Sequence, residues 1–64
     1  MSHPNAIKAI NMALNTKGFI VDDWNDEVAE SLKEEGGVPT DDPEGVLFVG
    51  NRDGKRWSVL LYHP

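Results

Sequence analysis

The side chains best suited to acid–base or metal chemistry are two histidines, His3 and His63, at opposite ends of the 64-residue chain. A histidine pair beside a carboxylate can act as a general base or hold a metal ion. Chain ends are usually exposed and poorly constrained, so these positions favour histidines without a chemical role. No serine or threonine lies in a nucleophile motif, and Gly36-Gly37 lacks the Gly-Lys of a phosphate-binding loop. We therefore expect no catalysis and no cofactor.

A run of acidic residues offers oxygen ligands for calcium. If a calcium loop of about twelve residues is counted from Asp23, its oxygen ligands are Asp23, Asn25 and Glu27, and Glu34 takes the twelfth place. The sixth place is Val28, where such a loop needs glycine for its sharp turn. The chain also has no cysteine, which excludes disulfides and thiolate-bound zinc or iron–sulfur sites. We expect no metal site.

Charge is spread unevenly along the chain, whose formal net charge is −5. Ten of the eleven acidic residues lie in segment 22–44 and are opposed there only by Lys33, whereas both flanking segments are weakly basic. Non-specific binding to nucleic acid depends largely on cations that neutralise phosphates. The acidic balance of the chain therefore argues against such binding.

Within the acidic segment, a helix-forming stretch carries carboxylates that can share one exposed surface. We call this set the acidic face: Asp26, Glu27, Glu30 and Glu34. One interpretation is a solvated surface that keeps a small protein in solution. The other is a docking surface for a basic partner, including a partner whose groove normally holds nucleic acid, which the acidic face would then mimic.

The elements that position these residues centre on a C-terminal hairpin. Two runs rich in β-branched and aromatic residues, 45–50 and 55–62, flank a tip that predicts a three-residue loop with Gly54 in the left-handed conformation. In that register Val49 faces Trp57, and side chains alternate between the two sides of the ribbon. One side is then core, and the other is a predicted apolar face made of Val46, Phe48, Leu60 and Tyr62. This second side is covered either by the rest of the fold or by another chain.

The tip of the hairpin carries the opposite charge from the acidic face. Arg52, Lys55 and Arg56 form a basic tip next to Trp57, and cations beside an aromatic ring can bind phosphates and stack on a base. In the predicted register Trp57 belongs to the core and is not free to stack. The simpler interpretation is a set of charged turn residues that keeps the tip solvated.

Periodic spacing predicts the first half of the fold. Apolar residues recur at intervals of three and four over residues 4–16, which predicts a helix, and Gly18 is expected to end it in the left-handed conformation. The apolar run 19–21 is expected to form a short strand, because a two-stranded hairpin alone is rarely stable in water.

A second helix is expected to follow, capped by Asp22 or Asp23 and ended by Gly36-Gly37. The segment 38–44, with its two prolines and three acids, is expected to be a turn-rich loop that leads into the hairpin. These elements, in the order α-β-α-β-β, predict a single α+β domain over residues 1–64, with two helices packed on a small three-stranded antiparallel sheet.

No stretch approaches the roughly 20 apolar residues of a membrane span, and the first four residues show no secretory signal. We therefore expect a cytoplasmic protein without membrane contact. The predicted function is a small non-enzymatic protein–protein interaction module, a regulator, inhibitor or adaptor that uses the predicted apolar face and the acidic face to bind another protein or a second copy of itself. The two alternatives are nucleic-acid binding by the basic tip and nucleic-acid mimicry by the acidic face.

Overall fold

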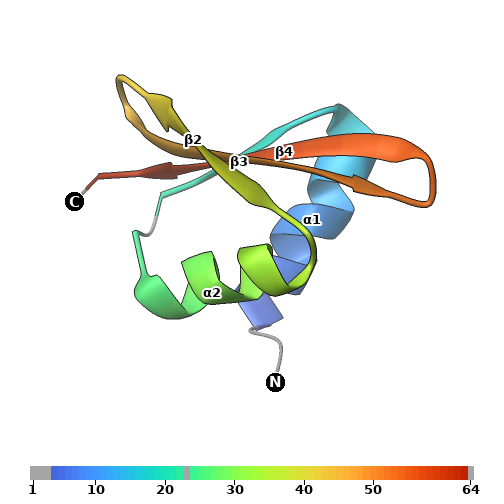
Figure 1. Ribbon diagram of the computed structural model, residues 1–64, viewed down its shortest axis with the longest axis horizontal. Helices are drawn as coiled ribbons and strands as arrows, with labels where there is room; N and C mark the ends of the chain where they lie inside the picture. The colour runs from blue at the N-terminus through green and yellow to red at the C-terminus, as the bar shows by residue number, and fades with distance from the viewer. Residues whose placement is uncertain (1–3, 23, 64) are drawn as a thin grey trace.

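The computed structural model describes residues 4–22 and 24–63, and within them the chain forms two helices and a four-stranded sheet (Figure 1). The elements in chain order are α1 (Pro4–Thr16), β1 (Phe19–Val21), α2 (Asp26–Glu34), β2 (Val38–Asp42), β3 (Gly45–Arg52) and β4 (Lys55–Tyr62). The α+β class and the predicted order of the elements are confirmed, and β2 is a further strand that lies where a loop was predicted.

The strands are arranged in the order β1-β4-β3-β2. β3 pairs antiparallel with both β2 and β4, whereas β1 pairs parallel with β4. The prediction of a purely antiparallel sheet is therefore wrong, because a three-residue strand contains no signal for its direction. β2 occupies an edge, where Pro39 and acidic side chains are tolerated and also discourage pairing with other chains.

The hairpin between β3 and β4 turns through two residues. Asp53 and Gly54 both have positive φ, 53° and 78°, which is typical of a type I′ turn, and Arg52 pairs directly with Lys55. The predicted three-residue loop is wrong, and the register is shifted by one residue. Because side chains alternate along a strand, this shift moves every β3 side chain to the opposite face of the sheet.

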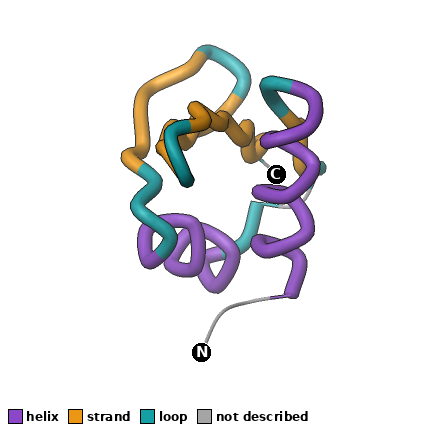
Figure 2. The backbone as a smooth tube through the Cα atoms, turned by 90° about the vertical axis from the view of Figure 1, so that its right-hand side faces the viewer, coloured by secondary structure: helices purple, strands orange, loops and turns teal. Residues whose placement is uncertain are grey.

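Both helices pack against the same face of the sheet and enclose the core with it (Figures 1 and 2). The largest buried side chain is Trp57, which lies opposite Gly50 on β3 and also reaches Gly37 after α2. Three alanines of α1 allow the helix to approach the sheet closely. The fully buried apolar side chains are Ala6, Ala9, Ile10, Ala13, Val28, Leu32, Phe48, Trp57, Val59 and Leu61.

The N-terminus of α2 is capped by Asn25. Its side-chain oxygen accepts a hydrogen bond from the backbone N–H of Glu27 at 2.8 Å. The predicted cap at Asp22 or Asp23 is wrong for Asp22, which lies before the helix, and Asp23 is outside the described residues. At the other end Gly36 takes φ 89° and closes a Schellman motif, as the pair of glycines predicts.

The end of α1 differs from the prediction. Lys17, with φ 68°, takes the left-handed position that was expected for Gly18. At position 18 space is tight for a different reason, because a β-carbon there would lie 3.1 Å from Oγ of Ser58. The start of β1 thus passes close to β4.

Replacing the cap residue, Asn25→Ala, is expected to lower the free energy of unfolding by about 1 kcal/mol, because the hydrogen bond from the N–H of Glu27 to the side chain of residue 25 is lost. Urea unfolding followed by circular dichroism measures this loss. Asn25→Ser keeps an acceptor and is the matched control, with an expected change below about 0.5 kcal/mol. Equal losses in the two variants would contradict the cap.

Candidate interaction surface

One face of the sheet packs on no helix in the described part of the chain (Figure 1). The pairing register places three cross-strand rows on this face, and we call it the open face. The first row is apolar except at its end on β2, and contains Ile20, Leu60, Leu47 and Thr40. The second row contains Ser58, Val49 and Val38, and the third contains Tyr62, Gly45 and Asp42.

The apolar side chains of the open face remain in contact with solvent. Ile20 is 52% exposed and Val38 is 59% exposed, at the two edges of the sheet. Leu47, Val49 and Leu60, between these edges, are half-buried. Half-burial is expected for side chains that stand side by side on a sheet without a second layer above them.

Two shallow hollows, both open to solvent, adjoin on the open face. One has a volume of about 680 Å³ and extends from Leu47 and Leu60 past Ile20 to Met12 on the flank of α1. The other, of about 470 Å³, shares Leu47 and Ser58 with the first and reaches Lys17 and Arg56. The apolar surface therefore continues around the β1 edge to α1 in one direction and meets two cations in the other.

The predicted apolar face is only half correct. Leu60 and Tyr62 lie on the open face, but Phe48 is 1% exposed in the core and Val46 packs beside it. The cause is the shifted register, because it turns every β3 side chain to the opposite face of the sheet, whereas the β4 side chains keep the faces that the sequence predicts. On β3, Leu47 and Val49 therefore lie on the open face, where Val46 and Phe48 were predicted. The missed signal is Asp53-Gly54, a dipeptide that favours two-residue hairpin turns.

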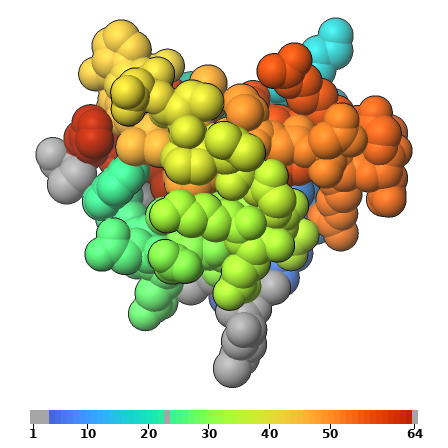
Figure 3. Space-filling model, viewed as in Figure 1, coloured from blue at the N-terminus to red at the C-terminus, as the bar shows by residue number. Residues whose placement is uncertain are grey.

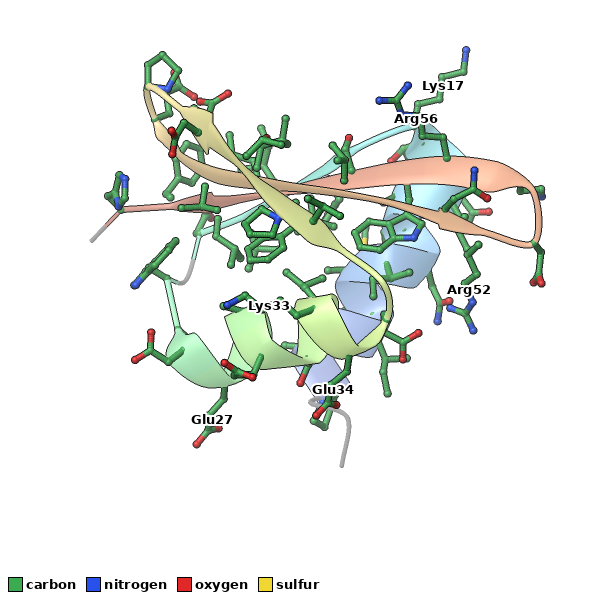
Figure 4. The ribbon with its side chains drawn as sticks, viewed as in Figure 1. Lys17, Glu27, Lys33, Glu34, Arg52 and Arg56 are labelled. Atoms are coloured by element: carbon green, nitrogen blue, oxygen red, sulfur yellow. The ribbon has the colours of Figure 1, made fainter. Side chains whose placement is uncertain are left out.

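Charges lie at the two ends of the open face. At the end near the β3–β4 turn, Lys17 and Arg56 both project from this side of the sheet (Figure 4). Asp42 lies at the other end, and its carboxylate accepts a hydrogen bond from the N–H of the exposed Glu44 at 3.0 Å. We call Lys17 with Arg56 the basic pole and Asp42 with Glu44 the acidic pole. In Figure 3 the open face forms the upper edge of the molecule, and this edge is lower in the middle than at its two ends.

The acidic face lies on the other side of the molecule. All four of its residues are exposed on α2, and Glu27 and Glu34 point away from the sheet (Figure 4). The sheet and the core separate them from the open face. The structure therefore does not combine the apolar and acidic surfaces into one interface.

The basic tip is divided between the two sides of the hairpin. Arg52 turns toward α1, where its Nη1 donates a hydrogen bond to Oδ1 of Asn11 at 3.3 Å, whereas Arg56 projects from the open face (Figure 4). Trp57, the aromatic residue beside them, is fully buried. The tip thus has no exposed aromatic ring on which a base could stack.

Among residues 4–22 and 24–63, the side chains considered for acid–base and metal chemistry do not gather in one place. His63 lies against Trp24, with ring centroids 5.3 Å apart, and His3 and Asp23 are outside the described residues. No group of three or more histidine, aspartate or glutamate side chains able to hold a metal occurs among residues 4–22 and 24–63. Over the same residues, neither helix is long and apolar enough to cross a membrane.

Comparison with protein-family models, with curated proteins and with solved structures finds no match for this chain.

Proposed function

We propose that the chain is a non-enzymatic protein-binding module, a regulator, inhibitor or adaptor that binds a partner protein on its open face. The observation that carries this proposal is the uncovered apolar row Ile20–Leu60–Leu47, which crosses the sheet from β1 to β3. A sheet with one solvated face usually presents polar side chains there. Apolar patches of this kind on a small protein mark interaction sites.

The energetics of the open face suit a protein partner. Burial of apolar surface contributes about 25 cal/mol per Å², and the branched side chains of the apolar row have little rotamer freedom to lose. The poles at its two ends supply charges that can orient an approaching partner. Nucleic-acid binding has less support, because Trp57 is buried and the basic tip is divided.

The remaining surfaces fit the same proposal. The acidic face is solvent-exposed and on the far side of the core, so we assign it to repulsion between copies and to solubility. We also place the protein in the cytoplasm, with which the absence of cysteine agrees.

Capture experiments with matched variants test this proposal. The immobilised wild-type chain is expected to retain a defined protein, from lysate or as a second copy, and Leu47→Glu or Leu60→Glu is expected to lose at least about 90% of it, because a carboxylate would be buried in the contact. Ile7→Glu is the control, since Ile7 is 40% exposed but lies on α1, away from the open face. Retention of the same proteins by all the chains would contradict the proposal.

A further inference from the structure

We infer that the protein covering the open face is a second copy of this chain, packed face to face with the basic pole of each copy against the acidic pole of the other. This inference rests on the proposed function and names the partner. It follows from the positions of the poles and of the apolar side chains on the open face, from the charges outside it and from its size.

The open face is complementary to itself after a half-turn. Along β4, Arg56 and Tyr62 mark its two ends, six residues apart, so the poles lie about 20 Å apart along the strands, and Asp42 also lies two strands across from Arg56. A two-fold axis in the plane of the face, perpendicular to the line between the poles, brings the basic pole of each copy over the acidic pole of the other. The same rotation places the region midway between the poles, which carries Leu47 and Leu60, against the same region of the other copy. A symmetric dimer requires such a self-complementary patch.

The charge outside the open face makes other arrangements of two copies unfavourable. The chain has a net charge of −5, and the acidic face covers the exposed side of α2. Two copies that approach through their helices bring like charges together. The open face carries two cations and two anions at its poles and is the surface on which this repulsion is offset.

The size of the open face predicts a weak dimer. Four strands about 4.8 Å apart, of which β1 has three residues and β2 has five, give a face of at most roughly 20 Å on each side. The projected area is at most roughly 400 Å² per copy, so the face is small for an interface of standard size, in which each partner buries about 800 Å² of accessible surface. We therefore expect a dimer that dissociates on dilution.

Sedimentation equilibrium over a concentration series tests the arrangement with two variants. In each variant, both poles of the open face carry charge of the same sign. The all-acidic variant is Lys17→Glu with Arg56→Glu. The all-basic variant is Asp42→Asn with Glu44→Lys, in which the new amide oxygen at position 42 keeps the acceptor that caps the turn. Each variant alone is expected to associate at least about tenfold more weakly than wild type, because like poles then face each other. An equal mixture of the two is expected to recover the dimer, because every pole then meets one of opposite sign.

The control is Lys33→Glu with Lys55→Glu, which makes the same change in net charge as the all-acidic variant, but on α2 and on the side of β4 that Trp57 shares, away from the open face. It is expected to keep at least half of the wild-type association constant. Dimers that survive Leu60→Glu, or that the pole variants weaken no more than the control does, would overturn the inference. A chain that stays monomeric at every concentration would also overturn it, while capture of a different protein by the open face would leave the proposed function standing.

Discussion

Gly50→Ala is expected to lower the free energy of unfolding by about 3 kcal/mol or more. A β-carbon at position 50 would overlap Cζ2 and Cε2 of Trp57, the cross-strand neighbour. The indole has little room to move aside, because it is fully buried and its other end packs closely on the backbone at Gly37, where an added β-carbon would lie 2.8 Å from Cη2. A domain of this length has a total stability of roughly 3–10 kcal/mol. Much of the fold's stability therefore depends on the absence of one methyl group.

Urea unfolding of four chains isolates this contact. In a Trp57→Leu background the ring is gone, so the additional cost of Gly50→Ala is expected to fall below about 1 kcal/mol. The double-mutant cycle separates the overlap with Trp57 from the change in strand propensity at position 50. A Gly50→Ala chain as stable as wild type would show that the indole does not lie over Gly50.

Phe48→Ala and Leu47→Ala are expected to have very different effects, although the residues are neighbours on β3. Phe48 is 1% exposed, and its truncation is expected to cost about 3–5 kcal/mol. Leu47 lies half-buried on the open face, and its truncation is expected to cost the monomer about 1 kcal/mol or less.

The pair distinguishes the observed hairpin register from the register with a three-residue loop. In the latter Leu47 is core and Phe48 faces outward, so the order of the two losses would be reversed. Measuring both variants at a concentration where the chain is monomeric removes any contribution from association. A larger loss for Leu47→Ala than for Phe48→Ala would contradict the observed register.

Much of the secondary structure could be predicted from the spacing and type of the apolar residues and from the turn residues between them. The span of α1, the short strand β1 and the two strands of the hairpin are where the apolar spacing predicts them. β2 could not be predicted, because Pro39 and two aspartates oppose strand formation, and the segment is held in place by its pairing with β3. Local preference and tertiary pairing disagree there, and pairing prevails.

The candidate site was harder to predict than the fold. The tip of the hairpin permits both a two-residue and a three-residue loop, and the two differ by one residue in register. Because strand side chains alternate, that single residue decides whether Leu47 or Phe48 faces the core. The β4 residues of the site, Leu60 and Tyr62, were assigned to the correct face, since Trp57, Val59 and Leu61 are buried in either register.

The position of β4 has a consequence for how the chain acquires its structure. β4 is the last element in chain order, yet it lies between β1 and β3 and supplies Trp57, Val59 and Leu61 to the core. β1 has no strand to pair with until β4 is available. During synthesis, the earlier elements therefore leave the ribosome before the strand that joins them, and we expect the complete sheet and core to form only after Tyr62 has emerged.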